Sequence, residues 1–328
     1  MATSTTTVPS AGPSAGSRSF LSRLRDGDEI ARIITFIFAA TVVLITLLLV
    51  LQLWHDSSLA RSKFGFQFFV KRIWDPINED FGALTFIYGT LVTAAVALLI
   101  AVPLGLGAAI FLAELAPQKI SDTLQFFIDL LAAVPSVIYG LLGMFIVVPV
   151  MRQYLQPALK KSLGFLPLFQ GPAFGVGFLT AGIVLAIMVI PYIISVSREV
   201  LLSVPRDQRE AALALGSTRW ESTWKVVVPF ARSGIMGSIF LALARALGET
   251  MAVTMVVGNT PTISASLFSP GYSIAAVIAN ELPEASGVYL EALIELGLVL
   301  FLFTFVLNGF ARLLLVLTTQ KGSGMGHV

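Results

Sequence analysis

Six long apolar segments dominate the sequence and limit what the chain can fold into. They cover residues 33–53, 84–112, 126–151, 178–196, 235–257 and 292–317. Each is long enough, as a helix rising about 1.5 Å per residue, to cross a hydrocarbon core about 30 Å thick. An apolar segment crosses a bilayer as a helix because the helix satisfies its own backbone hydrogen bonds. The sequence therefore predicts an all-α integral membrane protein with six transmembrane helices.

The composition agrees with this class and excludes several functions. Hydrophobic residues make up 56% of the chain and charged residues only 12%, whereas soluble domains are nearer a quarter charged. A net charge of +2 and the lack of a basic cluster give no sign of nucleic-acid binding. With no cysteine, disulfides and thiol chemistry are excluded. His55 and His327 have no second ligand at metal spacing, so we expect no metal and no cofactor.

Composition shifts divide the chain into four parts. Residues 1–17 are rich in Ser, Thr, Pro, Ala and Gly, so residues 1–29 are expected to form a disordered cytoplasmic tail. Residues 30–82 would hold the first transmembrane helix and an outer loop. Residues 83–318 would form a core of five transmembrane helices with a loop at 198–233, and residues 319–328 a second cytoplasmic tail.

The basic residues predict the orientation. Residues 258–291, between the fifth and sixth segments, contain no Lys or Arg. The loop between the fourth and fifth segments contains six: Arg198, Arg206, Arg209, Arg219, Lys225 and Arg232. Cytoplasmic loops carry an excess of Lys and Arg, which places both termini and the 198–233 loop inside. Arg61, Lys63, Lys71 and Arg72 lie in the first outer loop and run against this rule.

Two opposite charges interrupt the fifth apolar segment, Arg245 and Glu249. Charged residues at the centre of a spanning helix are costly and usually face a bundle interior or a water-filled path. Their i,i+4 spacing would put both on one helix face, with the hydroxyls of Thr250 and Thr254 near the same depth. The alternative is an ion pair that only neutralises the helix for insertion.

The 198–233 loop has the signals of two short helices. Pro205 would be the first helical residue, and the run after Glu210, which includes Ala211 and Ala212, is made of strong helix formers. Gly216 suits a left-handed C-terminal cap. Thr218 with Glu221 forms a capping-box pattern for a second helix. A helix lying on the membrane surface or a docking element for a cytoplasmic partner would both fit.

The loop also carries a known motif. Glu210-Ala211-Ala212, Gly216, Val226, Val228 and Pro229 stand at the spacing of the EAA loop of ABC-type import permeases. In that family, which this loop resembles, the motif docks into an ATP-binding subunit. The resemblance implies that Glu210, Ala211, Ala212, Gly216 and Pro229 couple this chain to such a subunit. It also implies the MetI-like permease fold of type I importers, with cytoplasmic coupling helices.

A second resemblance narrows the substrate. The run Arg245-Ala-Leu-Gly-Glu249-Thr250-Met-Ala-Val-Thr254, followed by Gly258-Asn259, is similar to phosphate ABC transporter permeases of the PstC type. It implies that Arg245, Glu249, Thr250 and Thr254 line a phosphate path. The chain has no G-x-x-x-x-G-K-[ST] run, so it is expected to have no ATPase site of its own and not to be an enzyme.

The resemblance implies a permease subunit of an ATP-driven phosphate importer in the bacterial inner membrane. Its partners would be a second, PstA-like permease, a dimer of ATP-binding subunits, an extracytoplasmic phosphate-binding protein and the bilayer lipids. One alternative is the same fold serving another oxyanion such as sulfate or molybdate. The other is a secondary anion transporter with Glu249 as a proton relay, which would need no ATP-binding partner.

Overall fold

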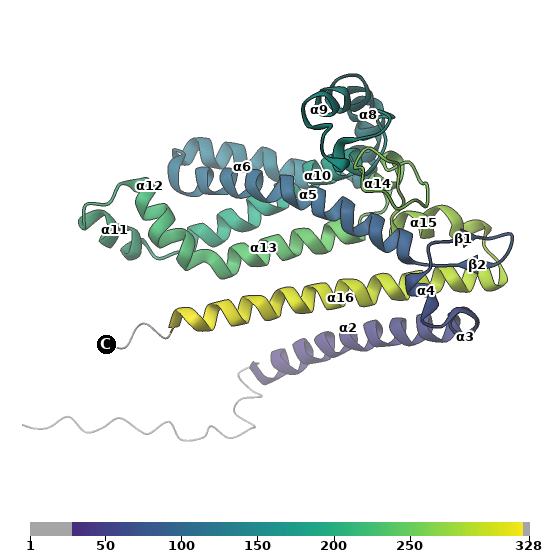
Figure 1. Cartoon of the computed structure of the whole chain (residues 1–328). Coiled ribbons are helices and arrows are strands. Elements are labelled where there is room, and N and C mark those ends of the chain that lie inside the picture. Colours follow the sequence, from purple (N-terminus) through teal and green to yellow (C-terminus); the bar gives the residue numbers. More distant parts are fainter. Residues whose placement is uncertain (1–27, 324–328) are drawn as a thin grey trace, which may run out of the picture. The chain divides into compact units, whose positions relative to one another are not determined.

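The computed structural model describes residues 28–323 and is almost entirely helical (Figure 1). The α-helices are α2 (Asp28–Asp56), α3 (Ser58–Phe64), α4 (Gln67–Val70), α5 (Leu84–Ile110), α6 (Gln118–Ala132), α7 (Ser136–Leu142), α8 (Val148–Val150), α9 (Gln156–Leu163), α10 (Phe178–Leu202), α11 (Arg206–Ala214), α12 (Arg219–Ser222), α13 (Val228–Gly248), α14 (Met251–Val256), α15 (Ile274–Glu281) and α16 (Gly287–Ser323). Short 3-10 turns are η4 (Pro167–Phe169) and η6 (Leu282–Glu284). Of the tails expected at 1–29 and 319–328, residues 1–27 and 324–328, with His327, lie outside the described residues. Residues 28–29 belong to α2 and residues 319–323 to α16, so both tails were predicted too long.

Contacts divide the chain after Gln52, so the part up to this residue is described by itself. Within it, α2 is apolar on all sides and exposes its side chains from residue 31 to residue 49. A helix without a polar face is better suited to a lipid environment than to water. It is the first of six helices, among the described residues, that are long and apolar enough to span a membrane.

The prediction of six membrane spans is confirmed by length and composition. The spans run over Ala31–Asp56, Leu84–Leu115, Ser136–Leu163, Phe178–Leu202, Arg219–Gly248 and Gly287–Phe310. Two predicted spans were wrong in their limits. The predicted segment at 126–151 contains the end of α6 and the start of a separate helix at Ser136. The predicted segment at 235–257 lies too far along the chain, because the observed span begins at Arg219 and ends at Gly248.

Pro135 explains the first correction. Proline disfavours helical backbone in the residue before it, which ends α6. The carbonyls left open at that end are satisfied by two tyrosines. Tyr139 donates its hydroxyl to Leu131 O, and Tyr192 of α10 donates to Ala132 O, both at 2.7 Å. The break between α6 and α7 is therefore stabilised by specific hydrogen bonds.

Helix α10 is the centre of the core and packs against α5, α6 and α13 (Figure 1). The α5–α10 contact uses small residues, among them Ala97, Ala101 and Ala181, all fully buried. Gly182 makes the approach closest, because a Cβ there would lie 2.4 Å from Val96 Cγ1. Small residues let membrane helices pack closely where no hydrophobic driving force acts between them.

Prolines also explain four π-helical segments. These are η1 (Phe111–Leu115), η2 (Gly143–Val147), η3 (Met151–Leu155) and η5 (Thr223–Val227), and each ends two residues before a proline: Pro117, Pro149, Pro157 and Pro229. Proline lacks an N–H and clashes with the carbonyl four residues earlier. The residue just before each proline bonds the carbonyl five residues back, as a π-turn requires.

The end of the bundle opposite α11 and α12 carries a small cap that includes a hairpin (Figure 1). Its aromatic side chains pack together, with Phe81 against both Trp74 and Tyr289. Strands β1 (Trp74–Asp75) and β2 (Asp80–Phe81) pair antiparallel. Trp74 Nε1 donates to Glu281 Oε2 at 2.8 Å, and the Tyr289 hydroxyl donates to the same oxygen at 2.6 Å. The hairpin is thereby fixed to α15 and α16.

Candidate functional site

The charged pair of the fifth span does not share a helix face, so the predicted i,i+4 geometry is wrong. Helix α13 ends at Gly248, and Glu249 has extended backbone with φ −71° and ψ 126°. A second helix, α14, begins at Met251. The Ala252 N–H donates to Glu249 Oε1 at 3.2 Å, so the carboxylate caps α14 as N-terminal acceptors do. Glycine at the end of α13 weakens continuation of the helix.

Arg245 is held by an aromatic ring and not by Glu249. Its Cζ lies 4.1 Å from the centroid of the Tyr192 ring, within the range of a cation–π contact. No ion pair joins Arg245 and Glu249 in the described part of the chain. The buried Nε of Arg245 has no hydrogen-bond partner. An unmade hydrogen bond of a buried donor costs about 1–3 kcal/mol, which a bound anion would recover.

The two threonines turn their hydroxyls toward the backbone. Thr254 donates to Thr250 O at 2.8 Å, and Thr250 donates weakly to Gly248 O at 3.4 Å. Both side chains are half-buried beside the break between α13 and α14. In this conformation they secure that break, and their oxygens remain free to accept.

The coupling segment, residues 198–233, folds largely as predicted. Helix α11 ends before Gly216, which has φ +89°, and α12 begins after it. The Glu221 N–H donates to Thr218 Oγ1 at 3.2 Å and the Thr218 N–H donates to Glu221 Oε2 at 3.0 Å, which confirms the capping box. Pro205 caps α11 and is not its first residue, a small correction.

The predicted coupling residues lie on one segment with different exposures. Glu210 and Ala211 of α11 are exposed, whereas Ala212 is buried, and Gly216 and Pro229 are exposed. Around them is a group of exposed apolar side chains: Leu213, Leu215, Trp220 and Trp224. Leu215 is 88% exposed. Trp220 and Trp224 pack edge to face, and exposed apolar side chains gathered on one segment are typical of an interaction site.

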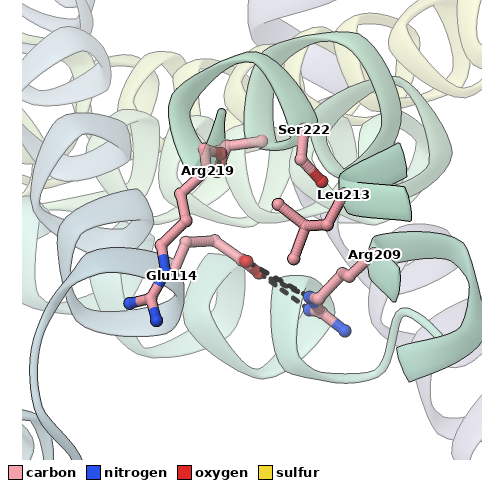
Figure 2. A pocket seen from close by; sticks show the side chains of 6 residues that line it. Glu114, Arg209, Leu213, Arg219 and Ser222 are labelled. Carbon is pink, nitrogen blue, oxygen red and sulfur yellow. Dashed lines mark hydrogen bonds and ion pairs between the residues drawn. The ribbon is translucent and has the colours of Figure 1, made fainter. Parts of the chain in front are cut away.

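An ion pair that the sequence did not predict joins the coupling segment to the second span. Figure 2 shows Arg209 of α11 facing Glu114 of η1, with Nη2 2.7 Å from Oε1 and Nε 3.2 Å from both carboxylate oxygens. Arg209 Nη2 also donates to Leu201 O at 2.7 Å. The sequence did offer one sign of this ion pair, because Glu114 is a carboxylate at the end of an apolar span. Its partner lies 95 residues away and has no sequence signature.

The pair borders a cavity of about 210 Å³ between α11 and α12, which Leu213, Arg219 and Ser222 also line (Figure 2). A second arginine, Arg198 of α10, is buried and donates to Ser121 Oγ at 3.0 Å and to Asp122 Oδ1 at 3.1 Å, both of α6. The two arginines therefore fix the coupling segment to η1 and α6. Within residues 28–323 no three His, Asp or Glu side chains gather as a metal site would require.

The helix that carries Arg245 reaches the coupling segment without a break. The run α12–η5–α13 extends from Arg219 to Gly248. At about 1.5 Å per residue, Arg245 lies roughly 39 Å along it from Arg219. Displacement of α12 would therefore move the arginine directly.

Comparison with known proteins identifies relatives of the whole architecture. Residues 101–315 match the family model of the binding-protein-dependent transport system inner membrane component. The chain is 52% identical to the phosphate transport system permease protein PstC of Xylella fastidiosa over 78% of this chain and 81% of that protein. It is 48% identical to the protein of the same name from Pasteurella multocida, over 88% and 91% of the two chains.

Solved structures share the fold at low identity. A bacterial ABC transporter involved in the import of the acidic polysaccharide alginate aligns with a TM-score of 0.59 and 16% identity, over 90% of this chain and 97% of that chain. An inward-facing MetNI methionine ABC transporter aligns with a TM-score of 0.52 and 15% identity, over 74% and 98%. These likenesses confirm the predicted MetI-like permease fold.

Proposed function

Because this multi-pass membrane protein belongs to the family of binding-protein-dependent transport system inner membrane components, in its PstC-type branch, we propose that it is the permease subunit of an ATP-driven phosphate importer. The relatives named as phosphate permeases support the substrate, since they match along most of the chain. The observation that carries the proposal is Arg245, a membrane-embedded guanidinium with an unused buried donor.

The chemistry of Arg245 suits phosphate. Arginine keeps its charge in a low-dielectric site and offers a planar fork of donors to phosphate oxygens. Contact with the Tyr192 ring orients the guanidinium while leaving Nε open. Glu249 caps α14, directly after the end of α13 that carries Arg245. Its negative charge would repel the anion and so limit how tightly Arg245 holds it.

Coupling would pass from α11 and α12 to the membrane helices along two connections. A partner that moves α11 would act on α5 through the Arg209–Glu114 pair. The same movement would act on Arg245 through the continuous α12–η5–α13 helix. Glu210, Ala211 and Gly216 form the exposed edge on which the partner would act. ATP would be hydrolysed by that partner and not by this chain.

The assembly would contain a second, PstA-like permease, two ATP-binding subunits and an extracytoplasmic phosphate-binding protein. We place the coupling segment and both termini in the cytoplasm, and the cap of β1, β2 and α15 outside the inner membrane, where the binding protein would dock. Residues 83–318 would be the permease core, which includes the family match at 101–315.

Uptake of radiolabelled phosphate into proteoliposomes that contain the complete complex tests the proposal. Uptake should require ATP inside and binding protein outside, and excess sulfate or molybdate should leave it unchanged. Equal competition by those oxyanions would reject phosphate as the substrate. ATP-independent uptake by this chain alone would reject an ABC importer.

A further inference from the structure

Glu295 of α16 is a buried carboxylate that the proposed phosphate path does not use. The residue is 2% exposed, and its Oε2 has no hydrogen-bond partner. It lies on α16 beside residues of α3 and α4. A charged carboxylate that is buried without a partner is costly, so its surroundings call for a cation or a strong donor.

A cavity of about 290 Å³ opens beside this carboxylate. Its wall is apolar and is formed by Trp54, Phe66, Phe69, Leu298 and Leu302. Several of these side chains are also largely exposed, Phe66 most of all. A mostly apolar cleft with few charged groups suits an amphiphilic ligand better than a small ion.

Arg61 supplies a positive charge on the wall of the same cavity. Its Cζ lies 3.7 Å from the centroid of the Trp54 ring, and its Nη1 donates to Ser57 Oγ at 3.1 Å. Within residues 28–323, its Nε and Nη2 make no hydrogen bond and it forms no ion pair with Glu295. Arg61 and Glu295 therefore line one cavity without pairing, and each can still make hydrogen bonds to a ligand.

The cavity lies where the apolar part of α16 begins. Residues 296–307, directly after Glu295, contain no charged side chain. Trp54 and Arg61 are of the types enriched where a membrane meets water, and Arg61 can extend toward that boundary. A headgroup that reached both opposite charges would leave an acyl chain room along Leu298 and Leu302, which line the same cavity.

We propose that this cavity binds one phospholipid with a primary ammonium and a phosphate in its headgroup, as in phosphatidylethanolamine. The ammonium donates to Glu295, the phosphate accepts from Arg61, and an acyl chain lies along Leu298 and Leu302. A trimethylammonium headgroup has no N–H to donate, and a phosphatidylglycerol headgroup brings no cation to Glu295. Charge complementarity therefore selects the amine lipid, independently of what the protein transports.

Native mass spectrometry of the full-length protein in its complex tests the site. The complex is reconstituted in vesicles of equal phosphatidylethanolamine and phosphatidylcholine, extracted in detergent, and its retained lipids are counted. A charge-assisted hydrogen bond predicts about tenfold preference for phosphatidylethanolamine in the wild type. Equal retention of the two lipids by the wild type would overturn the proposal.

Variants separate the two headgroup contacts. Glu295→Gln should bring the preference close to one, whereas Glu284→Gln, which removes a charge from an exposed position, should leave it unchanged. Arg61→Gln should reduce retention of both lipids without changing their ratio, because both carry a phosphate. An unchanged preference in Glu295→Gln would also overturn the proposal. If that variant does not assemble, the wild-type comparison of phosphatidylethanolamine with its N-methylated forms decides, since preference should fall as N–H groups are lost.

Discussion

Arg209 of α11 and Glu114 of η1 form a bidentate ion pair that joins the coupling segment to the second membrane span. Nη2 lies 2.7 Å from Oε1, and Nε lies 3.2 Å from both carboxylate oxygens. Both side chains are largely buried, so solvent screens the pair less than it screens a surface pair. Movement of α11 should therefore be felt at the end of α5.

Glu114→Gln should weaken this connection. The neutral amide can accept one hydrogen bond but cannot balance the Arg209 charge, and the expected cost is about 1–3 kcal/mol. We expect a lower melting temperature of the purified complex and less phosphate transported per ATP hydrolysed. Glu199→Gln is the matched control, because Glu199 is exposed and Arg198 keeps its bonds to Ser121 and Asp122. An equal effect of both variants would refute a special role for the Arg209–Glu114 pair.

Gly216 should be sensitive to backbone conformation and not to side-chain size. Its φ is +89°, and a Cβ at this position would meet nothing within 4 Å. Left-handed backbone costs an ordinary residue about 1–2 kcal/mol, and a β-branched residue resists it more. Gly216→Val should therefore uncouple ATP hydrolysis from transport, while Gly216→Asn should retain most coupling. If hydrolysis and transport in Gly216→Val both equal the wild type, the left-handed turn at Gly216 is not needed for coupling.

Pro229 should hold the π-turn of η5 in place. Pro229→Ala supplies an N–H, so the helix can return to regular α-hydrogen bonding and lose the extra residue of the turn. Shifting the register by one residue rotates α12 by about 100° relative to α13. We expect normal insertion but transport reduced several-fold. Distances between spin labels at Trp220 and Ala244 report the rotation, and an unchanged distance distribution would contradict it.

The hairpin turn should be acid-sensitive through Asp75. Hydrogen bonds from the Asn78 side chain, the Asn78 N–H and the Ile77 N–H lower the pKa of this carboxyl from its ordinary 3.8. A lowered pKa in the folded state means that the stabilisation is complete above 3.8 and is lost as the pH falls through the lower, folded value. The hydrogen-exchange protection of the Ile77 and Asn78 amides, relative to their intrinsic exchange rates, should fall in that window. Asn78→Ala should raise the pH at which it does so.

The sequence predicted those features that rest on local chemistry. Apolar length predicted the spans, and the Gly216 turn with the Thr218–Glu221 capping box followed from residue preferences within a few positions. The continuous helix through Arg245 and Glu249 was wrong, because helical spacing cannot reveal that Glu249 caps a new helix. Contacts such as Arg209–Glu114 join distant residues, so neither periodicity nor motif spacing could show them.

Phosphate uptake by Arg245→Gln tests the central claim most directly. The variant complex, reconstituted with ATP inside the vesicles and binding protein outside, is compared with Arg152→Gln, which removes an exposed arginine from another span. We predict that Arg245→Gln assembles normally, that it lowers the initial rate of phosphate uptake at least about tenfold through the loss of charge-assisted hydrogen bonds, and that Arg152→Gln transports normally. Wild-type uptake by a fully assembled Arg245→Gln complex would contradict the assignment of Arg245 to the phosphate path.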